Sequence, residues 1–425
     1  MESLKITFCT GEFPDHFSGV NTWIMNLSSG LLKFGITPHI IDLTFGEGNF
    51  SVLNFCSNQG LEFDRIQVNN GTTSETLVKY ILKILKSRGT DVFIPGYVDA
   101  AHYAIPYLTR AKLSTVIVLH SDDLRYKAYY DDFVVKESDY RAHVVVAVSD
   151  FIYRWVDGLP GTIVKSKIYC GITIPDVKKQ YSTSAKKLKL VYCGRLDQEQ
   201  KRVLDTFDAF NALVSQVSNI SCHFIGNGFK RPELLRRINS EGNNLITYDG
   251  QFESEKLQTK LLEYDIFILL SDYEGLPVGL LEAMSLGMTC ICLRTQSGVC
   301  EVIEHMKTGV LVEDRGPSLV KMVKQLASER HLLEAIGSSA RKLVICKYSS
   351  EQTTKKWIKL IEKIGPNDKV SIKIPNRIKI KIEKNPALDF FNTFNKELRT
   401  RRYKLLKLSK IGKLFRRIRS MLYEI

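Results

Sequence analysis

Two glutamates, Glu274 and Glu282, flank a turn whose composition suits the binding of an anion. The turn, residues 275–279 (Gly-Leu-Pro-Val-Gly), follows the apolar run 265–270 and leads into a predicted helix. A helix that begins after a buried strand exposes free backbone N–H groups at the positive end of its dipole, where phosphates bind. Carboxylates bind hydroxyl groups, so phosphate-binding amides beside two carboxylates suit a nucleotide-sugar.

A second glycine turn brings fixed positive charge. Gly194 ends the apolar run that begins at residue 188, and Arg195, Lys201 and Arg202 follow it. Arginine binds a diphosphate through bidentate hydrogen bonds and lysine binds it as a point charge, so the pair suits a phosphate leaving group. A solvated basic turn is the alternative interpretation of these residues, and their spacing does not rank Lys201 against Arg202.

The N-terminal half offers two further candidates, Gly19 and His120. Gly19 precedes an amphipathic helix, so a ligand phosphate could approach the amides at that helix start. His120 ends the apolar run 116–119 and could donate a hydrogen bond to a sugar hydroxyl. Each also has a structural interpretation, as a turn glycine and as a core histidine. Asp123 could bind an acceptor hydroxyl or cap the next helix, and Glu301 could be a helix N-terminal carboxylate.

The sequence lacks the usual ligand sets for a metal ion. Its nine cysteines are scattered without a Cys-x-x-Cys pair, and no Asp-x-Asp motif occurs. We therefore predict neither a metal nor another cofactor, and expect Arg195, Lys201 and helix N-termini to neutralise a bound diphosphate. The cysteine pattern favours a reducing cytosol. We expect no signal peptide, and no apolar run reaches the roughly 20 residues of a membrane span.

The elements that must position these residues form two similar halves. Short apolar runs alternate with amphipathic stretches, a pattern typical of parallel strands that helices cover on both faces. The predicted strands are 4–9, 38–43, 92–95, 116–119, 144–148 and 168–171, then 188–194, 221–225, 245–248, 265–270, 289–293 and 309–312. Predicted helices include 203–214, 318–328 and 350–364. The pattern predicts an α/β protein with two doubly wound, Rossmann-like domains, 1–183 and 184–365, that face a cleft.

The tail, 366–425, differs from this body in its charge. It holds 17 of the 60 Lys and Arg residues but only five of the 46 Asp and Glu residues. Alternating apolar and basic residues at 369–383 predict a hairpin that turns at 375–376. Apolar residues three and four apart at 405–422 predict a basic amphipathic helix, so 396–425 suits an anionic membrane surface. Docking on the protein's own body and contact with a nucleic acid or another partner are the alternatives.

Taken together, these motifs resemble those of retaining glycosyltransferases with the GT-B fold, specifically glycosyltransferase family four (glycosyl transferases group one). The resemblance covers about residues 4–364. Its most specific segments are 274–284 and 298–312, and the glycine turns at 18–19, 194–196 and 226–228 support it. The chain departs from the family's pattern at Cys170, where an asparagine is usual, and its Lys201 lies one residue further from Gly194 than in the commonest form.

The resemblance implies a role for each candidate residue. Glu274 and His120 would act at the donor sugar, and Glu282 would bind the ribose hydroxyls. Arg195 and Lys201 would neutralise the leaving diphosphate. The remaining implied donor-binding residues are Gly19, Leu276, Val278 and Gly279, all through backbone amides.

The implied activity is that of a hexosyltransferase, which moves a sugar from a nucleoside-diphosphate donor to an acceptor hydroxyl with retention and without a metal. The implied acceptor is a saccharide or lipid-linked saccharide in cell-surface polysaccharide or glycolipid assembly. We expect a cytoplasmic enzyme on the inner face of the membrane and no nucleic acid partner. A nucleotide-sugar epimerase of the same fold and a membrane-associated sugar-binding scaffold without catalysis are the alternatives.

Overall fold

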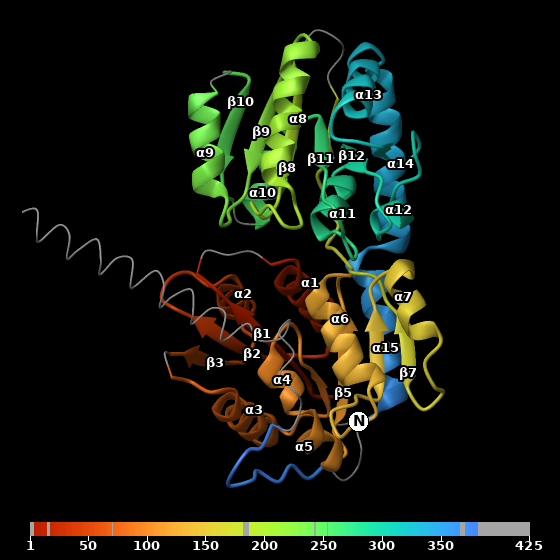
Figure 1. Cartoon of the computed structure of the whole chain (residues 1–425). Coiled ribbons are helices and arrows are strands. Elements are labelled where there is room, and N and C mark those ends of the chain that lie inside the picture. Colours follow the sequence, from red (N-terminus) through yellow and green to blue (C-terminus); the bar gives the residue numbers. More distant parts are fainter. Residues whose placement is uncertain are drawn as a thin grey trace, which may run out of the picture.

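The computed structural model describes residues 4–14, 18–69, 71–181, 187–241, 244–252, 254–365 and 370–380. Two separate parallel β-sheets, each with helices packed on its faces, lie one above the other (Figure 1). Buried apolar residues fill the strands of both sheets, as expected for strands covered on both faces. The arrangement confirms the prediction of two doubly wound, Rossmann-like domains.

The N-terminal sheet has seven strands in the order β3-β2-β1-β4-β5-β6-β7. Its strands are β1 (Ile6–Glu12), β2 (His39–Phe45), β3 (Phe63–Val68), β4 (Val92–Ile94), β5 (Ser114–Leu119), β6 (Val144–Ala147) and β7 (Val164–Lys167). The helices between them are α1 (Gly19–Lys33), α2 (Ser51–Gln59), α3 (Ser74–Arg88), α4 (Asp99–Tyr103), α5 (Ile105–Arg110), α6 (Leu124–Tyr130), the π-helical turn η1 (Asp131–Val135) and α7 (Asp150–Asp157).

The C-terminal sheet has six strands in the order β10-β9-β8-β11-β12-β13. Its strands are β8 (Leu188–Cys193), β9 (Ile220–Ile225), β10 (Ile246–Gly250), β11 (Ile266–Leu269), β12 (Thr289–Leu293) and β13 (Val310–Val312). The helices are α8 (Val203–Gln216), α9 (Arg231–Ser240), α10 (Ser254–Leu261), α11 (Val278–Ser285), α12 (Val299–Val302), α13 (Pro317–Ser328), α14 (His331–Lys347) and α15 (Ser350–Ile364).

The strand order creates a switch point in each sheet, between β1 and β4 and between β8 and β11. Connections on the two sides of such a point run in opposite directions, which leaves a crevice at the carboxyl ends of the strands. The candidate residues of the sequence follow the carboxyl ends of β1, β5, β8 and β11. The fold therefore places them at the edges where open parallel sheets bind ligands.

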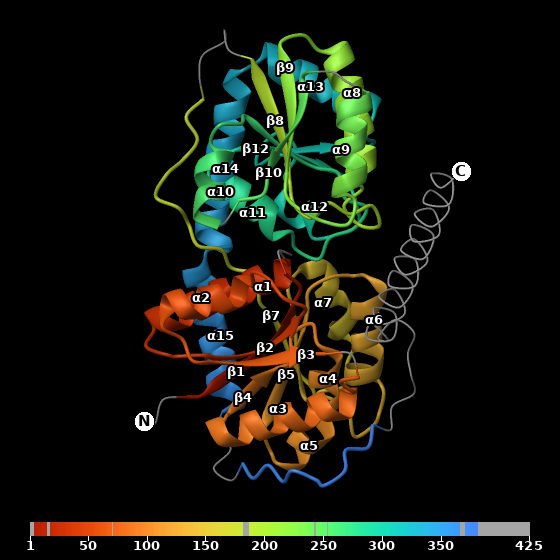
Figure 2. The same cartoon turned by 90° about the vertical axis from the view of Figure 1, so that its left-hand side faces the viewer.

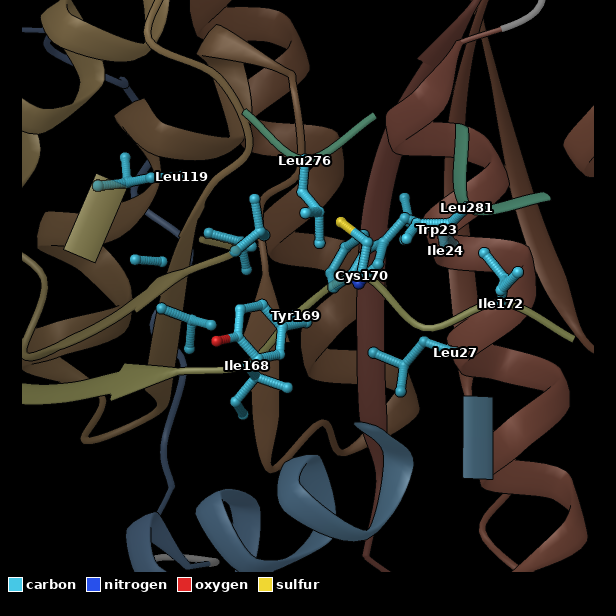
Figure 3. Close-up of a cluster of buried hydrophobic side chains, with 14 of the residues drawn as sticks. Trp23, Ile24, Leu27, Leu119, Ile168, Tyr169, Cys170, Ile172, Leu276 and Leu281 are labelled. Atoms are coloured by element: carbon cyan, nitrogen blue, oxygen red, sulfur yellow. The ribbon is translucent and has the colours of Figure 1, made fainter. Parts of the chain in front are cut away.

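A shared apolar cluster joins the two domains. Figure 3 shows Leu276 and Leu281 of the second domain beside Trp23 and Cys170 of the first. The last helix, α15, comes after the second sheet in the chain but lies along the first (Figure 2), where the ring of Trp357 is 5.7 Å from that of Trp23. The range 184–365, predicted as one domain, thus includes a helix that packs on the other.

Most predicted strands and helices are present, with one error and two omissions. Residues 168–171 were predicted as a strand, but β7 ends at Lys167 and the chain then turns towards α15. These residues are apolar because they are buried at the junction of the domains. The edge strands β3 and β7 were not predicted, because their exposed and half-exposed residues break the apolar pattern.

The described part of the tail, 370–380, packs on the N-terminal domain. Ile372 and Ile378 are buried there, and the Tyr107 hydroxyl donates to the carbonyl oxygen of Lys379 at 3.2 Å. No strand forms within 370–380, so the predicted hairpin is not seen in this part of the tail. The predicted amphipathic helix, 396–425, lies outside the described residues. Among the helices that are described, none has the length and apolar character needed to cross a bilayer.

Candidate active site

A cavity of about 330 Å³ lies between the two domains, at the carboxyl ends of both sheets. Its walls include residues from α1, α6 and the segment after β5 on one side and from β8, β11 and α11 on the other. The nine residues predicted for the site all line it, namely Gly19, His120, Arg195, Lys201, Glu274, Leu276, Val278, Gly279 and Glu282. The fold therefore brings together residues that are up to 263 positions apart in the sequence.

Glu274 is the most buried carboxylate of the cavity, with 5% of its surface exposed. The ammonium group of Lys201 forms an ion pair with its Oε1 atom. Arg202 instead pairs with Asp272, behind the cavity. The structure thus ranks the two cations that the sequence left unranked, and Lys201 is the one at the site.

Gln200 is a site residue to which the sequence analysis assigned no role. Its side-chain amide donates to the carbonyl oxygen of Tyr273 at 3.1 Å and to Glu274 Oε2 at 3.4 Å. Its Oε1 atom accepts from Arg195 Nη2 at 2.6 Å. Gln200 therefore connects the loop of Glu274 to the guanidinium group. Its only sequence signal was its position beside Lys201.

Glu282 faces the cavity from α11, where it is half-buried. Burial raises the pKa of its carboxyl group from the usual value near 4.5 to about 7. The same helix begins at Val278, so its N-terminal amides lie at the cavity wall beside the carboxylate. A ligand that donates hydroxyl hydrogens here would favour the ionised form of Glu282.

Gly19 is the first residue of α1, which enters the cavity from the N-terminal domain. The Ser18 hydroxyl caps this helix by accepting from the Val20 amide at 3.3 Å. A Cβ atom built on Gly19 would meet nothing within 4 Å. No described part of the protein thus requires a glycine here, whereas a ligand that approaches the helix start closely would.

His120 lies at the end of β5, with its ring packed edge-on against Trp23 at a centroid distance of 4.5 Å. Burial lowers the pKa of its imidazole to about 3, so the ring is neutral at physiological pH. Its Nδ1 atom is 3.9 Å from the sulfur of Cys170. A neutral imidazole can donate one hydrogen bond to a ligand but supplies no positive charge.

Two carboxylates named in the sequence analysis have structural roles. Asp123 caps α6 by accepting from the Arg125 and Tyr126 amides, both at 2.9 Å. Glu301 accepts from the Asp150 amide at 2.7 Å, at the start of α7. Glu301 is thus a helix N-terminal carboxylate, as one interpretation predicted, but the helix belongs to the other domain.

The backbones of the two domains meet at Gly275. A Cβ atom on this residue would overlap the carbonyl oxygen of His120 and lie 2.5 Å from the carbonyl carbon. On its other side, the carbonyl oxygen of Gly275 would overlap a Cβ atom built on Gly298. Glycine at 275 therefore allows the loop of Glu274 to approach the wall that carries His120.

Positive and hydroxyl-binding groups thus surround one cavity. Arg195, Lys201 and the N-termini of α1 and α11 suit two phosphate groups, and the two glutamates suit hydroxyl groups. Within the described ranges, no group of three or more His, Cys, Asp or Glu side chains is placed to hold a metal ion.

Comparisons with known proteins agree with this chemistry. Residues 173–343 match the family model for glycosyl transferases group 1. The chain is 26% identical over 294 residues to N-acetyl-alpha-D-glucosaminyl L-malate synthase of Bacillus anthracis, covering 63% of this chain and 75% of the relative. It is 30% identical over 148 residues to lipopolysaccharide 1,6-galactosyltransferase of Escherichia coli, covering 33% of this chain and 40% of the relative.

A solved structure shows the same fold. Anabaena HepE in complex with UDP-glucose superposes with a TM-score of 0.66 at 15% identity, covering 85% of this chain and all of that chain. The similarity spans both sheets and confirms the predicted GT-B fold. The fold, the family-model match over the C-terminal half and the relatives together identify the chain as a glycosyltransferase with a GT-B fold.

Proposed function

We propose that the protein transfers a hexose from a nucleoside-diphosphate donor to an acceptor hydroxyl, with retention, as a member of glycosyltransferase family four. The acceptor is a saccharide or lipid-linked saccharide in the assembly of a cell-surface polysaccharide or glycolipid. The enzyme works in the cytoplasm, and residues 396–425 hold it to the anionic inner face of the membrane.

One observation carries the proposal, the placement of Arg195, Lys201, Glu274 and Glu282 around a single cavity. The departing diphosphate develops negative charge, which the two cations and the N-termini of α1 and α11 stabilise. Lys201 moves from Glu274 to the phosphate when the donor binds. Glu274 is then free to accept hydrogen bonds from the sugar, while Glu282 accepts them from the ribose.

The similar proteins support the choice of donor and acceptor. The name of the Bacillus relative specifies an N-acetylglucosaminyl group, and that of the Escherichia relative specifies a galactosyl group and lipopolysaccharide. The HepE structure was solved with UDP-glucose. A UDP-hexose is therefore the first donor to test.

A thermal-shift panel of UDP, GDP, ADP and their hexose conjugates tests the proposal. A ligand that binds only the folded protein raises its melting temperature, and saturation at 100 times Kd adds about 2.7 kcal/mol of stability. We expect one diphosphate and its conjugates to stabilise the protein, and no stabilisation by any of them would contradict the proposal. Product analysis then separates the activities, because an epimerase would isomerise the donor without any acceptor.

Glu282→Gln should raise the stability of the folded protein and weaken its affinity for the donor. Because the native pKa, about 7, exceeds the usual value near 4.5, the folded state holds this proton more tightly. The resulting stability is present below pH 4.5 and is lost as pH rises through 7. The variant should therefore be about 3 kcal/mol more stable than wild type at pH 8 and nearly equal to it at pH 4.5.

The affinity of the same variant for the nucleoside diphosphate provides the second measurement. Wild-type affinity should rise between pH 6 and pH 8 as Glu282 ionises, whereas the variant should bind about tenfold more weakly at pH 8 with no such rise. Glu304→Gln is a matched control, since Glu304 is exposed and pairs only with Lys307 in the described structure. Equal affinity of wild type and variant at pH 8 would remove Glu282 from the ribose site.

A further inference from the structure

Two buried polar atoms on the N-terminal domain's side of the cavity have no hydrogen-bond partner within the described part of the chain. They are the hydroxyl oxygen of Tyr126 and the Nε2 atom of His120. Both residues line the cavity, and their rings lie 6.0 Å apart. Because a buried polar group without a partner is costly, such a pair calls for an explanation.

The tyrosine hydroxyl is held in place by the packing of its ring. Tyr126 lies in the first turn of α6, which Asp123 caps, and is only 3% exposed. The rings of Tyr97 and Tyr129 pack against it, at centroid distances of 5.2 and 5.8 Å. Burial keeps the pKa of the Tyr126 phenol well above its usual value, so the hydroxyl keeps its hydrogen.

Cys170 is the neighbour of the other ring nitrogen of His120, Nδ1. Cys170 is buried, and burial raises the pKa of its thiol to about 12, so the sulfur stays protonated. A protonated thiol 3.9 Å from Nδ1 can donate to this nitrogen or accept from it, so the contact is compatible with both neutral tautomers. Nε2 can therefore donate or accept a hydrogen bond, and it is neutral in either case.

We propose that the Tyr126 hydroxyl and His120 Nε2 together bind a hydroxyl group of the saccharide, which makes Tyr126 a ligand-binding residue. The inference rests on the proposed function. A saccharide hydroxyl both donates and accepts, so it can pair with Nε2 in either tautomer and exchange a second hydrogen bond with the tyrosine. A phosphate fits less well here, because both groups are neutral and the cations Arg195 and Lys201 come from the other domain.

Tyr126→Phe tests the proposal, with Tyr129→Phe as a matched control on the same helix. Tyr126→Phe removes a hydroxyl that has no hydrogen-bond partner among the described residues. The melting temperature of the ligand-free variant should therefore equal or exceed that of wild type. The Tyr129 hydroxyl donates to Asp99 at 2.6 Å, so Tyr129→Phe should lower the melting temperature and leave ligand affinity unchanged. The ligands are the diphosphate that stabilises the wild-type protein and its hexose conjugates.

We expect Tyr126→Phe to bind the free diphosphate as wild type does and to lose about tenfold in its interaction with the saccharide. A loss of hexose-conjugate affinity assigns the hydroxyl to the donor sugar, and a raised KM for acceptor alone assigns it to the acceptor. Unchanged values for both would assign the hydroxyl to ordered water and overturn the proposal. An equal loss for the free diphosphate, or a lower melting temperature, would also overturn it. Failure of wild type to bind any diphosphate would instead refute the proposed function.

Discussion

Gly275→Ala should lower kcat/KM for sugar transfer by about 10²-fold or more while both domains stay folded. The added Cβ would overlap the carbonyl oxygen of His120, at the end of β5, and lie 3.0 Å from the Cα of Ser121. These are backbone atoms, so no change of side-chain rotamer relieves the overlap. The two domains must move apart, which separates His120 from the loop of Glu274.

The measurement combines steady-state kinetics with the radius of gyration from small-angle X-ray scattering. We expect the variant to lose activity, to expand measurably and to keep the circular dichroism spectrum of the wild type. Gly158→Ala is the control, because a Cβ on that glycine would meet nothing within 4 Å and its backbone angle φ of −76° suits alanine. Activity near that of wild type would show that the close approach of the domains at Gly275 is not needed for transfer.

Glu274→Gln should lower kcat by about 10²–10³-fold, the usual effect of removing a preorganised charged group from a reaction centre. Glutamine keeps the size of the side chain but removes the negative charge beside the donor sugar. Lys201, freed from its ion pair, becomes available to the diphosphate. Diphosphate affinity should therefore be equal to or tighter than that of wild type.

The contrast between turnover and affinity makes this variant informative. Titration calorimetry with the diphosphate and turnover of the matching hexose conjugate give the two values, and circular dichroism verifies the fold. Glu304 is an exposed glutamate with a lysine partner, so Glu304→Gln should leave both values unchanged. Substantial turnover by folded Glu274→Gln would contradict the role of Glu274 at the sugar.

The sequence predicted the cavity well because its residues follow the strands that form it. Arg195 and His120 come directly after an apolar run and Glu274 comes four residues after one, and the carboxyl ends of parallel strands meet at one edge of a sheet. Local patterns therefore indicated which residues converge. The ranking of Lys201 above Arg202 was not predictable, because it depends on Asp272, which binds the arginine from behind the cavity.

Residues whose importance depends on an absent or distant partner were missed. Tyr126 has the sequence pattern of an ordinary helix residue, and only the lack of a described partner for its hydroxyl sets it apart. Gln200 gains its role from two loops that are separated by more than 70 residues. The pairing of α15 with the first sheet depends on contacts such as Trp357 with Trp23, which local periodicity does not reveal.

The cavity between the domains should bind a nucleoside diphosphate through its cations. Titration calorimetry of UDP, GDP and ADP against wild-type protein and Arg195→Ala measures this binding. We expect the wild-type protein to bind one of them and Arg195→Ala, still folded, to bind it at least about tenfold more weakly, since a charge-assisted hydrogen bond is lost. A folded wild-type protein that binds none of the three, or an arginine variant with unchanged affinity, would show that the cavity is not a diphosphate site.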